Sequence, residues 1–391
     1  MAATRGTPLP CIQMFRDISV GKAKDENCVF SPCSVQLAIS LITNGAKGPT
    51  LEVLLKFLQA ENKNQLKSRA SELISALMES SMEGPKLSFV GGIWVDESKK
   101  LTQNFKADAE TIYKAKAEEV DFKKNAKEMI KTVNQWAAES TNGLIDSLLP
   151  ENSIDDRTRV VLANALYFKG LWSFPFVKSL TEDFEFYMLG EDSVKVPFMS
   201  NYNDTQYIVT FDDLKVLRLP YGKSSFSMYI LLPNDRDGLW PLVEKVGSDP
   251  SLLDQYASAE KMDLVPVGRF RVPKFKINYK LEASEVLKDM GLELCFSKEK
   301  AEFNEMVVGG RIKLHAVHHG SRIEVDEEGT EAAASTEIEM DFEVGCSKFD
   351  DEEPPMVRVN FVADHPFMYV VKDDNSGIVM FIGHVVNPLL A

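Results

Sequence analysis

The alternation of side chains from Thr330 to Glu343 is the feature that most restricts how this chain can fold. Even positions carry small or apolar side chains, such as Ala332 and Phe342, whereas every charged side chain lies at an odd position. In a strand, this pattern gives one face that can be buried and one acidic face that prefers water. Alanine is nevertheless a poor strand former, and the acidic flanks of the segment favour an exposed loop or a frayed helix.

Both signals are satisfied if the segment is a loop in one state of the protein and a strand in another. Small side chains let it slide between existing strands, and the alternation fixes its register once it lies there. Each inserted residue adds a backbone hydrogen bond with a net worth of roughly 0.5–1.5 kcal/mol. A strand of about ten residues would then release on the order of 5–15 kcal/mol, which is comparable to the stability of a whole domain.

The composition describes a globular chain without basic character. Its 391 residues are 44% hydrophobic and carry a net charge of -15, which argues against sequence-independent binding to nucleic acid or anionic membranes. The longest apolar runs, such as Val160–Phe168, are far too short to span a bilayer, and the first residues lack the apolar core of a secretory signal. We expect a cytoplasmic protein, with the nucleus and unconventional release from the cell as alternatives.

The cysteines and histidines indicate neither a disulfide framework nor a metal site. Five cysteines are an odd number without metal-ligand spacing, so we expect reduced thiols at Cys11, Cys28, Cys33, Cys295 and Cys346. His315, His318 and His319 could in principle bind a metal ion, but no cysteine lies nearby and the segment has the pattern of a strand. Asn203 begins a glycosylation sequon that we interpret as a loop. We expect no cofactor.

The first 85 residues are predicted to be mostly helical. One helix begins at Ser31, with Pro32 in its first turn and apolar side chains at helical spacing. Gly45 and Gly48 end this helix, and Thr50 is expected to cap the next one. Further helices are expected at 101–116, 125–139 and 281–290.

From about residue 180 onward, the pattern changes to strands. A shorter strand at 87–95 and a buried strand at 160–168 precede this part of the chain. The later strands are expected at 207–210, 215–219, 226–232, 263–275, 367–371 and 378–386. No repeat or linker divides the sequence, so we predict one α+β domain over residues 1–391.

The sequence carries none of the common catalytic motifs. It has no Gly-x-Ser-x-Gly elbow, no Walker loop, no dinucleotide-binding fingerprint and no His-Glu-x-x-His. We therefore expect that the protein is not an enzyme and has no catalytic residues, and a hydrolase is an alternative with no motif behind it.

Several motifs, in order and spacing, resemble those of the serpins, a family of protease inhibitors. They are Asn27–Ser34 with Gly45–Thr50, Asn134–Trp136 with Thr141–Gly143, Val161–Trp172, Val272–Lys276, Phe361–Phe367 and the hinge-like stretch Glu327–Ala334. The resemblance covers almost the whole chain and is greatest to the intracellular plant-type branch. It implies N-terminal helices packed on a large central β-sheet, two further sheets and an exposed reactive-centre loop at about residues 327–358.

The resemblance also implies a mechanism and a partner. A serine or cysteine protease attacks the loop and forms a covalent acyl-enzyme, and the cut loop inserts into the central sheet and carries the protease with it. Deacylation then fails because a shift of about 1 Å in the catalytic groups can reduce the rate roughly a hundredfold. The protein would be a monomeric suicide-substrate inhibitor.

The resemblance assigns roles to individual residues. The loop hinge would comprise Gly329, Thr330, Glu331, Ala332, Ala333 and Ala334. A polar cluster beneath the opening sheet would comprise Ser31, Ser34, Asn164 and His319. Trp172 would lie where the loop first enters the sheet.

The cut bond departs from the plant-type pattern of a basic residue. Inhibitors of the family are usually cut about fifteen residues along the chain from the hinge glycine. Counting Gly329 as the first residue, the fifteenth is Glu343, so the resemblance implies a cut between Glu343 and Val344. A slightly different register would select Asp341 or Phe342 instead, and Lys348 would be the cut residue if the extra residues of the loop lie before the cut.

The segment from Val344 to Arg358 is longer than usual for the family and strongly acidic. This feature keeps a second function open, a non-inhibitory member of the family acting as a binding or chaperone-like protein. Cys346 within the segment is either a redox-sensitive thiol or an incidental one. Outside the loop, Lys63, Lys67 and Arg69 are interpreted as a solvated helix face and not as a polyanion site.

Overall fold

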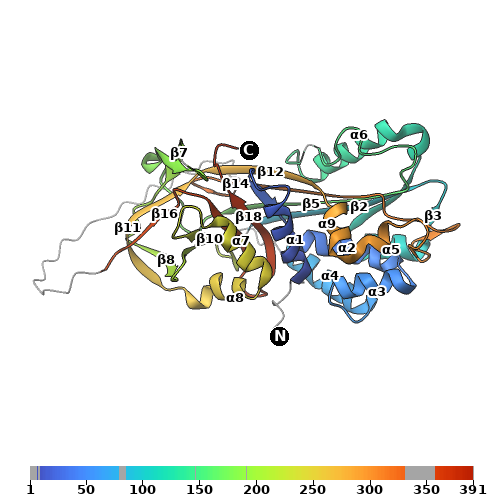
Figure 1. Cartoon of the computed structure of the whole chain (residues 1–391), viewed down its shortest axis with the longest axis horizontal. Helices are drawn as coiled ribbons and strands as arrows, with labels where there is room; N and C mark the ends of the chain where they lie inside the picture. The colour runs from blue at the N-terminus through green and yellow to red at the C-terminus, as the bar shows by residue number, and fades with distance from the viewer. Residues whose placement is uncertain are drawn as a thin grey trace, which may run out of the picture.

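The helices and strands of the computed structural model, which describes Thr7 and residues 9–78, 85–145, 147–190, 192–330 and 357–390, form sheets with helices on their faces (Figure 1). The helices are α1 (Leu9–Val20), α2 (Pro32–Gly45), α3 (Gly48–Phe57), α4 (Lys63–Met78), α5 (Gln103–Thr111), α6 (Phe122–Ser140), α7 (Leu239–Ser248), α8 (Leu252–Tyr256) and α9 (Ser284–Leu287). Most of the early helices gather at one end of the molecule, as the sequence pattern predicts.

A six-stranded sheet follows the long axis of the molecule (Figure 1). In spatial order its strands are β12 (Phe275–Glu282), β14 (Ala316–Val325), β15 (Gly329–Thr330), β5 (Val160–Leu171), β2 (Lys86–Asp96) and β4 (Ala115–Val120). The strand expected around the histidines is confirmed for His318 and His319, which lie in β14, whereas His315 precedes it.

Strand β5 is an inner strand of this sheet, and helices cover both of its faces. Leu162 packs in the large core that includes residues of α2, whereas Val161 and Ala163 pack in a second core with Val133 of α6. Figure 1 shows α2 and α6 on opposite sides of the sheet. Burial on both faces explains why β5 is a continuous apolar run in the sequence.

Ten further strands form a second large sheet, in which β11 pairs with strands on both of its sides. The strands are β1 (Cys28–Phe30), β18 (Val379–Val385), β17 (Phe367–Asp373), β10 (Phe226–Pro233), β9 (Leu214–Pro220), β8 (Thr205–Thr210), β11 (Leu264–Pro273), β7 (Ser193–Met199), β6 (Glu182–Tyr187) and β16 (Val359–Val362). The start of β11 pairs with β8, and its later residues pair with β16 and β7. The strand predicted at 263–275 is confirmed as β11, which ends at Pro273, and the chain continues from there into β12 of the other sheet.

The predicted start of the first long helix is confirmed, but the cap predicted for the next helix is wrong. Ser31 caps α2, since its side chain accepts a hydrogen bond from the N–H of Ser34. Helix α3 begins earlier than expected, at Gly48, whose φ of +53° turns the chain into the helix. Thr50 is already inside the first turn, and its Oγ1 accepts a hydrogen bond from the N–H of Glu302.

Two other predicted helices are too long. The helix expected at 101–116 is confined to α5, which ends at Thr111. Lys114 then adopts a left-handed conformation with φ +49°, and β4 begins at the next residue. The helix expected at 281–290 begins later, since its first residues complete β12, and it changes from α9 into a π-helical turn that ends near Gly291, with φ +97°. A short two-stranded sheet of β3 (Lys100–Leu101) and β13 (Val307–Val308) completes the described fold.

Candidate functional site

The candidate site is the junction between β5 and β14, where the two-residue strand β15 lies between them at one end. Seven residue pairs join the two strands in parallel, from Val161 with Ala316 to Tyr167 with Arg322. Beyond these pairs, β15 lies between the strands and is antiparallel to both, since Thr330 pairs with Gly170 of β5 and Val325 of β14. The sheet is therefore closed along most of this junction and open only at one end.

Gly329 fits into β15 because it has no side chain. It pairs with Leu171 of β5. A Cβ at this position would overlap the carbonyl oxygen of Gly170 and the backbone of Leu171. Backbone atoms within a paired strand cannot move aside as a flexible side chain can, so only glycine is accommodated here.

Thr330 is fully buried and is connected to the predicted entry residue Trp172. Its Oγ1 lies 2.6 Å from the hydroxyl oxygen of Tyr221. The Tyr221 ring stacks on the Trp172 indole with a centroid distance of 4.5 Å. Trp172 in turn donates its backbone N–H to the carbonyl of Glu328 and its indole N–H to the carbonyl of Asp326, both at 2.9 Å. The structure thus places Trp172 against the chain that enters the sheet.

The residues Asp326–Glu328, which we call the entry turn, are held by ion pairs that sequence analysis missed. The Glu327 carboxylate accepts hydrogen bonds from Lys274 Nζ and Thr181 Oγ1, both at 2.8 Å. Glu328 makes a more exposed ion pair with Lys178. Burial opposes ionisation of Glu327, but the bonds from Lys274 and Thr181 outweigh it, so the pKa of this carboxyl is lowered.

The four residues of the predicted polar cluster are brought together by the structure. The Ser31 N–H donates to His319 Nε2 at 3.2 Å, and Ser34 Oγ lies 3.3 Å from His319 Nδ1. Asn164 Nδ2 donates to Ser34 Oγ at 2.8 Å. His319 and Asn164 are register partners in β14 and β5, so Ser34 of α2 contacts both strands. Ser321, which the sequence analysis did not select, is a further member, with Oγ 2.8 Å from His319 Nε2.

The hydrogen bonds of His319 determine which of its ring nitrogens carries the proton. A backbone N–H can only donate, so Nε2 must be the acceptor and Nδ1 carries the proton that faces Ser34. Burial lowers the pKa of His319 to about 3, and the ring is neutral at pH 7. His318, on the opposite face of β14, is also buried, which lowers its pKa to about 4.

The remaining predicted loop residues lie outside the described part of the chain. They are Glu331, Ala332, Ala333 and Ala334 of the hinge, the candidate cut residues Asp341, Phe342, Glu343, Val344 and Lys348, and Cys346. Cys11, Cys28, Cys33 and Cys295 are buried free thiols. Burial raises the pKa of Cys33 to about 12, which leaves it a poor nucleophile at neutral pH.

The basic residues of α4 do not form the solvated face that the sequence suggested. Lys63 Nζ donates to the last carbonyls of α2 and to Glu305. Lys67 pairs with Asp108 at 2.7 Å, and Arg69 donates to carbonyls at the end of α3. These charges hold neighbouring helices together, which the spacing of basic residues along one helix cannot reveal.

Among the described residues, none of the helices combines the length and apolar character of a membrane span. In the same residues, no three His, Cys, Asp or Glu side chains lie close enough to share a metal ion.

Comparisons with known proteins agree over nearly the whole chain. The sequence model of the family described as "Serpin (serine protease inhibitor)" matches residues 10–388. Serpin-ZXA of Oryza sativa subsp. japonica is 43% identical over 375 residues, which cover 93% of this chain and 91% of that protein. Serpin-ZX of Arabidopsis thaliana is 41% identical, covering 94% of this chain and 93% of its own length.

Solved structures give the same result. The structure of Arabidopsis AtSerpin1 in its native stressed conformation has a TM-score of 0.85 and 37% sequence identity, and it covers 100% of both chains. Cleaved Serpin 42Da has a TM-score of 0.81 and 30% identity, with 98% of each chain covered.

Proposed function

The chain belongs to the serpin family, and on this premise we propose that it is a suicide-substrate inhibitor of a serine or cysteine protease. The family consists generally of protease inhibitors, and the similar plant proteins support this class of function. Trapping by loop insertion is the finer proposal, and it rests on the contacts around β15.

The observation that carries the proposal is that β15 already occupies the first two positions of a slot between two parallel strands. The sequence that follows keeps the alternation of small and charged side chains. Since Thr330 points into the core, Ala332, Ala334 and Thr336 would follow it on the buried face. The charged odd positions would face the side of the sheet that α6 covers.

The register of β15 supports Glu343–Val344 as the bond that the protease cuts. Continued from Thr330 and Gly170, it brings residue 340 opposite Val160, the first residue of β5. Glu343 then follows just beyond the end of the new strand. Lys348 lies five residues further, which would leave about 17 Å of slack at roughly 3.3 Å per residue. A taut connection displaces the acylated protease, whereas a slack one does not.

The chemistry needs only the protease's own catalytic groups. Its serine or cysteine attacks the carbonyl carbon of Glu343, and the amino group of Val344 leaves with a proton supplied by the protease. The acyl-enzyme ester or thioester then travels with the inserting loop. Displacement from the protease's base and oxyanion donors prevents attack by water.

The polar cluster fits the role of a junction that must open during insertion. The same register brings Thr336 between Asn164 and His319, whose strands Ser34 now links to α2. These hydrogen bonds must exchange as the strands separate, and the Thr336 hydroxyl would arrive where polar partners are available. The cluster would therefore influence the rate of insertion.

We place the activity in the cytoplasm and expect a monomer. Support for the location comes from the four described cysteines, which are buried as free thiols and form no disulfide among themselves.

Incubation with a glutamate-specific endopeptidase, trypsin, chymotrypsin and papain tests the proposal by denaturing gel and intact mass. We expect a detergent-stable adduct with one of them and a released fragment that begins at Val344. Thr330→Arg, which places a long charged side chain at a buried position of β15, should convert the protein into an ordinary substrate. Cleavage of the native sequence without adduct by every enzyme would instead favour the non-inhibitory binding or chaperone-like function, to which the acidic segment 344–358 also points.

A further inference from the structure

A groove of about 350 Å³ lies beside the entry point of the loop and is not used by the insertion mechanism. Aromatic and apolar side chains line it, among them Trp172, Phe174, Tyr202, Tyr207 and Leu264. Tyr202 is 73% exposed, and Phe174 and Leu264 are each 51% exposed. Such a cluster of exposed large apolar side chains is unusual on a monomer and is typical of an interaction surface.

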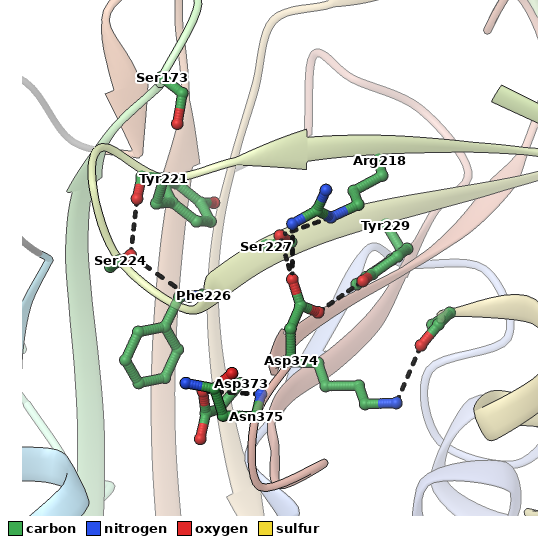
Figure 2. Close-up of polar contacts among 12 residues, drawn as sticks. Ser173, Arg218, Tyr221, Ser224, Phe226, Ser227, Tyr229, Asp373, Asp374 and Asn375 are labelled. Atoms are coloured by element: carbon green, nitrogen blue, oxygen red, sulfur yellow. Dashed lines mark hydrogen bonds and ion pairs between the residues drawn. The ribbon is translucent and has the colours of Figure 1, made fainter. Parts of the chain in front are cut away.

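Two aromatic residues that line the groove are held in place by their neighbours. Trp172 is fixed by its stack on Tyr221, and the Tyr207 ring has the Arg218 guanidinium 5.2 Å from its centroid. Figure 2 shows that Arg218 is itself held by Asp374, and the Nη2–Oδ2 distance is 2.9 Å.

Two neighbours complete this support, since Asp374 also accepts hydrogen bonds from Ser227 Oγ at 2.7 Å and from the hydroxyl of Tyr229 at 2.5 Å (Figure 2). The charge of Arg218 is therefore satisfied within the fold and not available to a partner. A rigid apolar surface loses little conformational entropy when it is covered.

Both described ends of the reactive loop border the groove. On one side, Trp172 contacts the entry turn that leads into Thr330. On the other side, Arg358 forms a 3.8 Å ion pair with Asp204, which lines the groove. Figure 1 shows that β8, β11 and β16, which contribute to this region, lie at the end of the molecule opposite α3 and α5. A protease that binds the loop is thus brought directly to this surface.

We propose that the groove is a second docking surface for the protease that attacks the loop. Protease–inhibitor interfaces cover about 800 Å² per partner, an area large enough to include surface beside the loop. The occupant is an apolar protrusion of the enzyme with a basic side chain beside it, because the Asp204 side chain is 89% exposed and its ion pair with Arg358 is long, at 3.8 Å. The inference rests on the proposed function only in requiring that a protease attack the loop.

Kinetics of loop attack test this surface separately from trapping. The total rate constant for loss of intact protein, adduct and cleaved product together, is measured with the glutamate-specific endopeptidase, trypsin and chymotrypsin. For at least one of these enzymes, Phe174→Ser, Tyr202→Ser and Leu264→Ser are each expected to lower it about tenfold, as loss of an interface anchor does. Asp204→Asn should lower it less and reduce its dependence on salt.

Val308→Ser is the matched control, because Val308 is 62% exposed but lies in the small β3–β13 sheet, remote from the groove. Its rate constant should equal that of the native sequence. Rates unchanged in all groove variants, with every enzyme that cuts the loop, would overturn the proposal. Faster attack would also overturn it, since the groove would then be covered by a segment of this chain or by a second copy. Slower attack without any adduct would retain the docking surface while rejecting inhibition.

Discussion

At the residue scale, Glu327 is the charged group whose surroundings matter most for the native state. Lys274→Met removes its main partner and leaves a buried carboxylate that, among the described residues, keeps Thr181 as a side-chain donor. We expect the free energy of unfolding of the intact protein to fall by about 1–3 kcal/mol, seen as a lower heat-denaturation midpoint. The entry turn should also become more accessible to proteases, because its anchor to β11 and β12 is lost.

The neighbouring pair of Lys178 and Glu328 provides the control for this prediction. The Lys178 side chain is 65% exposed, so Lys178→Met should change stability by less than about 1 kcal/mol. Equal destabilisation by both substitutions would contradict the special role of Glu327.

The buried histidines make the native state sensitive to acid. Burial lowers the pKa of His319 to about 3 and those of His318 and His384 to about 4, against 6.5 in an exposed chain. Between pH 6.5 and about 4, the unfolded chain therefore binds protons that the folded chain excludes. Stability is complete above pH 6.5 and should fall by about 1.4 kcal/mol per pH unit for each histidine below it.

Heat-denaturation midpoints measured from pH 7.5 to pH 5 check this expectation. His319→Gln keeps groups that can donate and accept in the polar cluster but does not titrate. Its midpoint should depend less steeply on pH than that of the native sequence below pH 6.5. The same slope in both proteins would show that His319 is not excluded from protonation in the fold.

The sequence reveals individual site residues unevenly. Ser34, Asn164 and His319 were found through motifs, whereas their hydrogen bonds depend on the pairing of β5 with β14, and no local pattern encodes that pairing. Glu327 was missed because a glutamate in an acidic segment normally faces solvent. Lys274 lies within the quoted motif Val272–Lys276, but only the fold brings it to Glu327.

At the element scale, β15 is the shortest described strand of the central sheet and the one at which we propose that insertion of the loop begins. Gly329→Ala should displace it, because the added Cβ has no space beside Gly170 and Leu171. Each 1.4 kcal/mol of lost stabilisation at this step slows insertion about tenfold. We expect fewer protease molecules trapped per loop cut, measured as the ratio of adduct to cleaved protein.

Leu171→Ala is the control for the β15 prediction, since its side chain is 57% exposed and the backbone pairing with Gly329 is retained. Its adduct ratio should remain that of the native sequence. A Gly329→Ala protein that still traps normally would mean that β15 is not an obligatory first step.

Elements with strong periodicity were predicted well from the sequence, and short ones were not. Strand β5 was recognised as an apolar run, and α6 as an amphipathic helix, because each buries a face along many residues. The two residues of β15 are too few to show a periodic pattern, and their pairing is determined by the adjacent strands β5 and β14. The helix ends near Lys114 and Gly291 depend on single left-handed residues, which apolar spacing does not register.

At the scale of the whole molecule, the sequence alone predicts an α+β protein but not its topology. Strands β5 and β14 are neighbours although about 150 residues separate them in the chain. Parallel pairing of distant strands leaves no turn signal between them. The central sheet was therefore expected only because the motifs resemble those of a known family, and the structural comparison confirms that fold.

Cleavage of the loop should make the whole molecule more stable, and this is its most distinctive expected property. Continued insertion would extend β15 by about ten residues within the six-stranded sheet and release on the order of 5–15 kcal/mol. For a chain of this size, that corresponds to a rise of about 6–18 °C in the heat-denaturation midpoint after cutting at Glu343. Thr330→Arg, cut at the same bond, should show no rise, because its buried position cannot accept the charged side chain. Scanning calorimetry of both proteins before and after cleavage measures this rise. An equal rise in both cut proteins would mean that the added stability does not come from a strand that continues from β15.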